Sequence, residues 1–376
     1  MNRFCEHCER ITTDGNLWCQ ERNCPADLGH VVLHYGDYIG DLKITKLLRV
    51  WRTAALYEAS RGEEKVLLKV AHETEDSEER LKREALAFEA LTDKPWGPVK
   101  FIRSFMSTPR SALPELLSPY PGPSKRPFGE ITVRNETKYF SVFRYIQGKF
   151  LSDLLLENPQ LWHVHAAWIV ISLAEVLQPL ASAGKAHLCL TPDIILIDMD
   201  EQGHMRPVLL DLGFIVAGAE LESIHEFGRL CEPAYTAPEL LAGRAAKTAS
   251  PAADVYSLGM LFYEMLAGKP AFESKLRRDD KIREAVGQFR GSLPVGRPEL
   301  ETAGVIAVVD KATAPTARYG NVAEFGGVLA GIYGRAPAEK RPVPTRLYVL
   351  LSVIGVVFLV IMGVAAYYLI GALGAG

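Results

Sequence analysis

Residues 347–370 form an apolar run without a charged side chain, and this run constrains the chain more than any other feature. About 20 apolar residues are enough for a helix to cross the hydrocarbon layer of a membrane. The alternative is a buried helix of a globular domain, which would need the caps or polar breaks that this run lacks. The run therefore predicts one C-terminal transmembrane helix.

Basic residues flank only one side of this predicted helix. Lys340, Arg341 and Arg346 precede it, and no charged residue follows it. Positive charge gathers on the cytoplasmic side of a membrane helix. We therefore expect residues 1–346 to lie in the cytoplasm, with a single-pass C-terminal anchor. The prolines and basic residues of 333–346 predict a stiff, extended linker.

The composition bounds the rest of the chain. The 376 residues are enough for one large domain with small additions. The formal net charge of −3 gives no basic footprint of the kind that nucleic-acid-binding proteins carry. We therefore expect no nucleic-acid partner.

Four of the six cysteines fall near the N-terminus, at Cys5, Cys8, Cys19 and Cys24. Two short pairs of thiolates suit a tetrahedral Zn²⁺ site, and a cytoplasmic setting disfavours disulfides. Residues 1–30 contain too little apolar surface to fold alone, so a metal would supply the folding free energy. The spacing favours a structural zinc ribbon. An iron site and four unliganded thiols stay open as alternatives.

Between residues 40 and 332 a series of short motifs follows in a fixed order. Several of them combine an apolar strand or a helical pattern with one polar residue. The motifs are Val66–Val70 with Lys69, Arg80–Leu86 with Glu84, the strand Tyr139–Ile146, the stretch His187–Leu196, Val208–Gly213 with Asp211, Tyr235–Glu239, Asp254–Gly259 and Asp310–Tyr319.

In content and order these motifs resemble those of the protein kinase superfamily, of the bacterial Ser/Thr-kinase type. The resemblance implies an α+β, two-lobed fold over about residues 40–332. The N-lobe would span about 40–146 and the C-lobe about 147–332. It also implies ATP and Mg²⁺ as cofactors and phosphoryl transfer as the ancestral chemistry.

One group of motif residues is of the kind that holds this fold together. His187 resembles the histidine of the family's internal spine, and Asp254 resembles the aspartate that accepts backbone N–H bonds beneath the catalytic loop. Glu239 and Arg318 resemble the family's buried ion pair between the activation segment and a late helix. Buried charges must be paired, so any folded member is expected to retain them.

Three residues of the family's nucleotide site remain. The resemblance implies that Lys69, paired with Glu84, holds phosphates and that Asp211 holds a Mg²⁺ ion. The alternative is that Lys69 and Glu84 survive only as a salt bridge between elements. Weak binding of ATP and Mg²⁺ is therefore an open expectation.

The groups that act on the transferred phosphate are lost. The family's base aspartate is Cys189 here, its lysine is Thr191, and its second metal ligand is Ile194. The stretch Arg49–Tyr57 stands in place of the glycine-rich loop and contains no glycine. Its large side chains either fill the phosphate space, which we favour, or contact phosphate. Asp193 is the one candidate for a displaced base.

The stretch Pro109–Pro127 is rich in proline and predicts an extended insertion between the fourth and fifth strands. A spacer and a docking segment for a partner are both open. Together these features predict a membrane-anchored, kinase-like signalling protein impaired in catalysis (a pseudokinase), acting as a scaffold or allosteric partner of an unknown protein. The alternative is a divergent, active Ser/Thr protein kinase.

Overall fold

The computed structural model describes most of the chain, but not the predicted membrane anchor. The described residues are 2–5, 8, 10–12, 19, 24, 29–92, 112–133, 135–199, 203–224, 227–241, 250–274, 277–290, 292–302, 304–335 and 362. All of them except Met362 belong to one compact unit. The predicted linker from residue 336 onward and, apart from Met362, the predicted helix 347–370 lie outside the described residues.

The N-terminal cysteine segment contains three short antiparallel strands. Strand β1 (Asn2–Phe4) is central and pairs with β2 (Ile11–Thr12) on one side and β3 (His30–Val32) on the other. Cys5 follows β1 directly, so the sheet fixes the position of the first predicted metal ligand.

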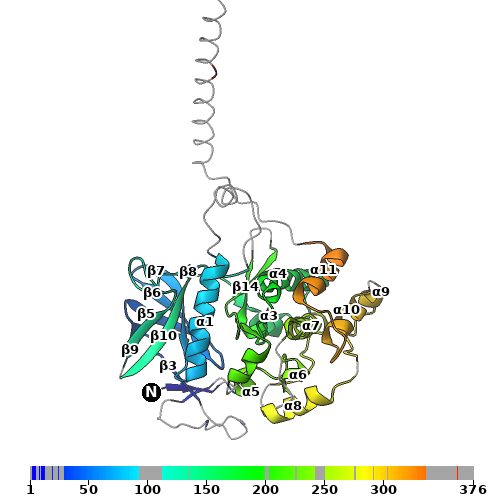
Figure 1. Cartoon of the computed structure of the whole chain (residues 1–376), viewed down its shortest axis with the longest axis horizontal. Helices are drawn as coiled ribbons and strands as arrows, with labels where there is room; N and C mark the ends of the chain where they lie inside the picture. The colour runs from blue at the N-terminus through cyan, green and yellow to red at the C-terminus, as the bar shows by residue number, and fades with distance from the viewer. Residues whose placement is uncertain are drawn as a thin grey trace, which may run out of the picture. The chain divides into compact units, whose positions relative to one another are not determined.

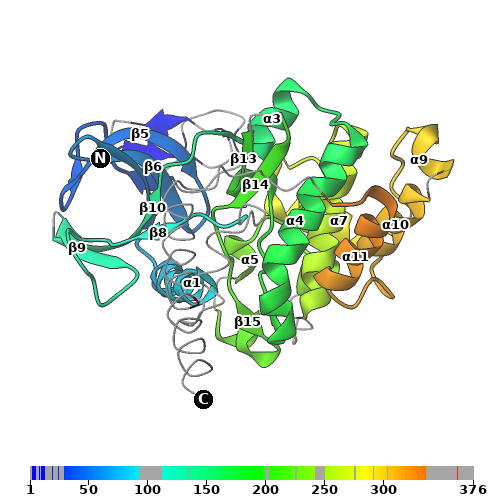
Figure 2. The ribbon, with the colours of Figure 1, turned by 90° about the horizontal axis from the view of Figure 1, so that it is seen from above.

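The N-lobe is an antiparallel sheet with one long helix against it (Figures 1 and 2). The strands run in the order β4-β5-β6-β7-β10-β8, and β9 pairs with β10. Gly62, at φ 61°, makes the turn between β6 and β7. The bounds are β4 (Tyr38–Ile39), β5 (Leu42–Val50), β6 (Ala54–Arg61), β7 (Glu64–Ala71), β8 (Leu116–Leu117), β9 (Gly129–Val133) and β10 (Glu136–Arg144).

Helix α1 (Glu75–Thr92) contains the predicted helical motif. Its buried residues Leu81, Glu84 and Phe88 recur at helical spacing, as the sequence pattern predicts. Acidic residues occupy its first turn, where they stabilise the positive end of the helix dipole.

The C-lobe is built mainly of helices around α7 (Pro251–Ala267). Ser250 caps α7 and Gly268, at φ 76°, ends it. The other helices are α3 (Leu151–Glu157), α4 (His163–Ser182), α5 (Phe227–Leu230), α6 (Pro238–Leu241), α8 (Asp279–Gln288), α9 (Pro298–Thr302), α10 (Val305–Thr313) and α11 (Val322–Tyr333), with the 3₁₀ turns η1 (Pro192–Ile194) and η2 (Ala219–Ser223).

Two small sheets place the polar motifs of the C-lobe. The first has the order β11-β13-β14, and the second pairs β12 with β15. The strands are β11 (Lys149–Phe150), β12 (Lys185–Ala186), β13 (Ile195–Met199), β14 (Met205–Leu209) and β15 (Val216–Ala217). The two-lobed α+β fold predicted from the sequence is confirmed.

Among the described residues, helix α4 is long and apolar enough to cross a membrane. Half of its most apolar window is buried within the protein. Its residues Ile169, Leu173 and Leu177 belong to the main apolar core. Helix α4 is therefore a core helix of the C-lobe, and the anchor predicted over 347–370 stays a prediction.

Part of the proline-rich stretch pairs with the N-lobe sheet. Within it, Leu116 and Leu117 form strand β8, which pairs with Phe143 and Val142 of β10. Antiparallel backbone hydrogen bonds hold these two residues at the edge of the sheet. Residues 109–111 lie outside the described residues, and the role of the stretch as a spacer or a docking segment stays a prediction.

Candidate functional site

A cluster of buried charges lies between the N-lobe sheet, α1 and the segment after β14. The ammonium Nζ of Lys69 lies 2.6 and 2.8 Å from the two carboxylate oxygens of Glu84. The same Nζ lies 2.6 Å from Oδ2 of Asp211. The structure thus brings together the three predicted nucleotide-site residues from three separate elements. Their binding of a nucleotide stays a prediction.

Arg80 completes this cluster, although the sequence motifs did not point to it. Its NH2 lies 2.5 Å from Oδ1 of Asp211. Burial acts to raise the pKa of Asp211, but Arg80 and Lys69 outweigh it and hold that pKa well below its usual range. Arg80 precedes Glu84 by four residues, so both lie on one face of α1. That spacing is the signal that could have revealed it.

The loop after β12 retains its supporting contacts. Asp254 accepts hydrogen bonds from the backbone N–H groups of His187, at 2.7 Å, and Leu188, at 2.8 Å. Leu188 has φ 68°, a conformation that side chains with a Cβ rarely adopt, and these bonds hold it. The predicted role of Asp254 is confirmed. His187 is fully buried and its Nε2 lies 2.8 Å from the backbone oxygen of Asp211.

Gly213 permits the close approach of the Asp211 segment to this loop. Its φ is 68°, and a Cβ there would lie 2.1 Å from the backbone oxygen of His187. Its N–H donates to Oδ1 of Asp211 at 2.7 Å. A glycine is therefore required at this position by both conformation and space.

Cys189, at the position of the family's base, is buried. Its thiol is a weak donor 3.7 Å from the backbone oxygen of Leu230. Burial is the main cause that raises the pKa of Cys189 to about 12. The thiol is therefore neutral near pH 7 and a poor acceptor for a hydroxyl proton. Ile194, at the position of the second metal ligand, is also buried and offers no oxygen.

Trp51 occupies the approach to the charge cluster. Its indole Nε1 donates to the backbone oxygen of Asp193 at 3.1 Å, which joins the two lobes. The Nζ of Lys69 lies 5.0 Å from the centre of the Trp51 ring system. Trp51 is only 8% exposed. These contacts agree with the favoured alternative, in which large side chains fill the space of the missing glycine-rich loop.

Arg52 makes a second connection between the lobes. Its guanidinium lies 2.5 Å from Oδ2 of Asp279 on α8 and 2.9 Å from Oε2 of Glu232. It also donates to the backbone oxygen of Arg229 at 3.0 Å. Arg52 thus pairs with carboxylates of the C-lobe. Its positive charge is therefore already neutralised and attracts a phosphate less strongly.

Asp193, the candidate displaced base, has other partners. Its Oδ1 accepts from Ser152 Oγ at 2.7 Å and lies 3.3 Å from NH1 of Arg49. Arg49 also lies 2.6 Å from Oδ2 of Asp153. The Asp193 side chain is 45% exposed. An oxygen that already accepts from a cation and a hydroxyl has less capacity left for a substrate proton, which reduces the fitness of Asp193 as a substitute.

The expected ion pair after the activation segment is present. The two carboxylate oxygens of Glu239 each lie 2.9 Å from a guanidinium nitrogen of Arg318. Arg318 is 5% exposed but Glu239 is 41% exposed. The prediction of the pair is confirmed, and the expectation that both partners are buried is wrong for Glu239.

Trp51, Arg52, Cys189 and Asp193 border a cleft of about 550 Å³. The loop with Trp51 and Arg52 forms its N-lobe side, and Cys189, Thr191 and Asp193 line its C-lobe side. Arg80 and Asp211 of the charge cluster also line this cleft, and there they are paired with each other.

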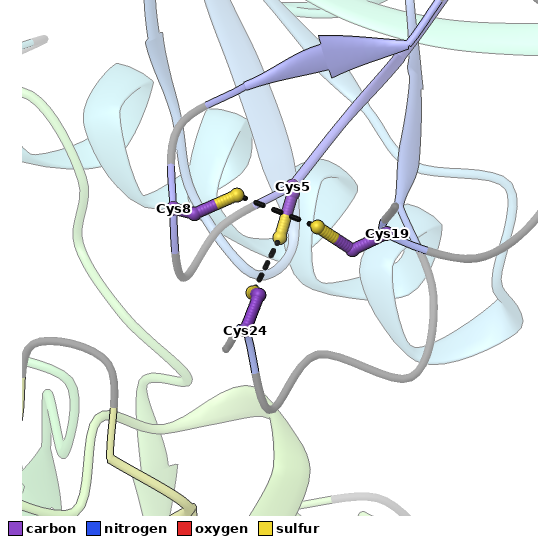
Figure 3. Close-up of side chains that lie close together, drawn as sticks. All are labelled: Cys5, Cys8, Cys19 and Cys24. Atoms are coloured by element: carbon purple, nitrogen blue, oxygen red, sulfur yellow. Dashed lines mark hydrogen bonds between the residues drawn. The ribbon is translucent and has the colours of Figure 1, made fainter. Parts of the chain in front are cut away.

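The four N-terminal cysteines converge (Figure 3). Their sulfur atoms all lie within 4.8 Å of one another. Cys5 and Cys24 approach to 3.5 Å, and Cys8 and Cys19 to 3.4 Å. Four sulfurs at about 2.3 Å from a tetrahedral Zn²⁺ would lie about 3.8 Å apart.

The electrostatics of the four thiols also suit a cation. Burial, with hydrogen bonds from neighbouring sulfurs, raises the pKa of Cys8 to about 11. Crowded sulfurs thus resist losing protons by themselves, whereas a metal ion stabilises the thiolates. The residues fit the predicted structural Zn²⁺, with Cys5, Cys8, Cys19 and Cys24 as its ligands.

A short series of contacts connects this cysteine site to the cleft. His30, the first residue of β3, stacks on His72 with ring centroids 4.0 Å apart. Nε2 of His72 lies 2.8 Å from the backbone oxygen of Trp51. The backbone N–H of His72 donates to the oxygen of Thr53 at 3.0 Å. The cysteine segment therefore supports the loop that covers the charge cluster.

Comparisons with known proteins agree with this geometry. The model of the protein kinase domain family matches residues 130–302. The chain is 35% identical over 133 residues to the Serine/threonine-protein kinase PkaA of Streptomyces coelicolor, which is 35% of this chain and 23% of that protein. It is 30% identical over 219 residues to the Serine/threonine-protein kinase PknK of Mycobacterium tuberculosis, 55% of this chain and 18% of that protein.

Solved structures show the same fold. A double mutant of the kinase domain of Mycobacterium tuberculosis PknI superposes with a TM-score of 0.53 at 19% identity, covering 81% of this chain and 100% of that one. These matches show that the chain contains a protein-kinase-like domain with the two-lobed kinase fold. It matches only about a fifth of the length of the curated relatives named above.

The superfamily implies ATP and Mg²⁺, and the residues present do not fit the metal. Both carboxylate oxygens of Asp211 are engaged by Lys69 and Arg80. Ile194 replaces the second ligand with an apolar side chain. We therefore derive no catalytic step through a bound Mg²⁺ ion.

Proposed function

We propose that this chain is a membrane-anchored, kinase-like signalling protein that acts by binding other proteins rather than by transferring phosphate. The observation that carries this proposal is the state of Cys189. Phosphoryl transfer to a protein hydroxyl needs a group that orients the hydroxyl and accepts its proton. The buried thiol, whose pKa burial raises to about 12, does neither at physiological pH.

The closure of the nucleotide site supports the same proposal. Trp51 covers Lys69, and Arg52 binds Glu232 and Asp279 across the cleft. A nucleotide would have to displace these contacts before its phosphates reached Lys69. Catalysis by positioning and electrostatic stabilisation requires such groups to be available.

The binding role fits the retained framework. The Asp254 contacts, the Glu239–Arg318 pair and the core around α7 preserve a kinase-shaped surface without its chemistry. The predicted anchor would hold this surface at the cytoplasmic face of a membrane, with the zinc ribbon beside the N-lobe. The partner would be another protein.

A divergent Ser/Thr protein kinase is the second candidate. The names of PkaA and PknK, and the position of Asp193 beside the cleft, favour it. The contacts of Asp193 with Ser152 and Arg49 count against it.

A phosphotransfer assay separates the two functions. The full chain in detergent, incubated with labelled ATP and Mg²⁺ or Mn²⁺, should label neither itself nor a general protein substrate. Phosphotransfer that is lost in both Asp211→Asn and Asp193→Asn would establish the active kinase instead. The Glu130→Gln variant, changed on β9 away from the cleft, controls for loss of a carboxylate elsewhere.

A further inference from the structure

We propose that the guanidinium of Arg80 is a built-in replacement for the divalent metal ion at Asp211. The charge cluster is thereby closed to Mg²⁺ and Mn²⁺, and Asp211 is an internal counter-ion rather than a metal ligand. This inference deepens the proposed function and rests on it for its biological meaning. Arg80 is the residue that determines which cations the site rejects.

The hydrogen-bonding capacity of Asp211 is almost used up. Oδ1 accepts hydrogen bonds from the guanidinium of Arg80 at 2.5 Å and from the N–H of Gly213 at 2.7 Å. Oδ2 accepts one from the ammonium of Lys69 at 2.6 Å. A carboxylate offers about four lone-pair positions. A Mg²⁺ ion would need a carboxylate oxygen at about 2.0–2.1 Å in near-octahedral geometry. It would therefore have to displace Arg80 or Lys69 from its ion pair.

The charges of the cluster are already balanced. Lys69 and Arg80 carry two positive charges, which the carboxylates of Glu84 and Asp211 match. All four side chains are at most 7% exposed. Burial raises the pKa of Glu84 to about 7, and a proton there would make the cluster more positive still. Adding a dication to this buried group would leave excess positive charge with little water to solvate it, which is strongly unfavourable.

Arginine is the side chain suited to this place. Its guanidinium stays charged when buried and is more weakly hydrated than an ammonium group. Phe214 supports it, with the guanidinium carbon 4.7 Å from the ring centre. Helix α1 presents Arg80 one turn before Glu84, so one helix supplies the cation for Asp211 and the carboxylate for Lys69.

The position of the family's second metal ligand also agrees with a site that binds no metal ion. Ile194 stands where the family's Asn holds a second ion, and it is 4% exposed. One cation position thus holds a fixed protein cation, and the residue expected to form the other is apolar.

The experiment measures Mn²⁺ binding to the full chain by the loss of the free Mn²⁺ electron paramagnetic resonance signal, with and without a non-hydrolysable ATP analogue. Wild type and Asp211→Asn should bind the same amount of Mn²⁺. Arg80→Met should bind one further Mn²⁺ per chain, and the Arg80→Met/Asp211→Asn double variant should lose it. Arg83→Met, the same change one position before Glu84, should behave as wild type.

Two results would overturn the inference. One is Mn²⁺ binding by wild type that Asp211→Asn abolishes, a comparison that needs no Arg80 variant. The other is the absence of any gain in Arg80→Met and in the milder Arg80→Gln, once circular dichroism shows both folded. Asp211-dependent Mn²⁺ binding without phosphotransfer would defeat this inference alone. Phosphotransfer would defeat the proposed function.

Discussion

Trp51 donates its indole N–H to the backbone oxygen of Asp193 at 3.1 Å, so a residue of the N-lobe is bonded to the segment that should carry the phosphate chemistry. This bond crosses the cleft at the position where the family has a flexible glycine-rich loop. The chain itself therefore bridges the cleft between the two lobes at this point.

Replacing Trp51 should destabilise the protein and loosen the contact between the lobes. Trp51→Ala removes a side chain that is 8% exposed, and such changes cost about 3–5 kcal/mol. Urea denaturation should show this loss in the free energy of unfolding. Trp162→Ala, at a position 55% exposed, is the matched control and should cost less than about 0.5 kcal/mol. Equal losses in the two variants would contradict a structural role for Trp51.

The cysteine site should hold one Zn²⁺ ion per chain. Cys24→Ser removes a ligand and should abolish the zinc measured by elemental analysis. Cys231→Ser changes a buried cysteine outside the site and should leave the zinc content unchanged. Because His30 stacks on His72, and His72 bonds to Trp51, zinc loss should also speed amide hydrogen exchange in residues 49–53. Unchanged zinc content in Cys24→Ser would show that Cys24 is not a zinc ligand.

Glu264 should make stability depend on pH. Burial raises the pKa of Glu264 from 4.5 to about 7, so the folded state holds a proton that the unfolded state releases. This stabilisation is complete below about pH 4.5 and is lost as the pH rises through about 7, at up to about 1.4 kcal/mol per pH unit.

Glu264→Gln should remove this dependence, so its unfolding free energy should gain on wild type between pH 5 and pH 8. Tyr235 donates to Glu264 at 2.7 Å, which acts to lower that pKa. Tyr235→Phe should therefore shift the midpoint of the pH dependence upward. A difference between wild type and Glu264→Gln that is constant with pH would show that Glu264 does not titrate in this range.

The predicted anchor gives a test of topology. Protease added outside intact cells should leave residues 1–346 uncut, because the basic residues before the apolar run favour a cytoplasmic domain. An epitope tag placed after residue 376 should be accessible from outside. Cleavage of the kinase-like domain by external protease would contradict the predicted orientation.

The sequence predicted the framework because its residues act through local patterns. The strand with Lys69, the helix with Glu84 and the turn at Gly213 each follow from spacing and conformational demand. Their meeting at one site followed from the resemblance to a known fold. The support of Leu188 by Asp254 could be predicted in the same way.

The contacts that close the site could not be read from the sequence. Trp51 and Asp193 are 142 residues apart, and Arg52 and Asp279 are 227 apart. No local period encodes such pairs, because they depend on how the lobes meet. In the sequence, Arg80 resembles any charged residue of a surface helix. Only the structure shows that it pairs with Asp211. Strand β8 is only two residues long, too short to separate from its proline-rich surroundings.

The most direct measurement is a thermal-shift titration of the full chain with ATP, in the presence and absence of Mg²⁺. A ligand that binds only the folded state at 100 times its Kd would add about 2.7 kcal/mol of stability. Because Trp51 covers Lys69 and Arg80 occupies Asp211, we predict no Mg²⁺-dependent rise in Tm. A rise in Tm that requires Mg²⁺ and disappears in Asp211→Asn would contradict the closed site.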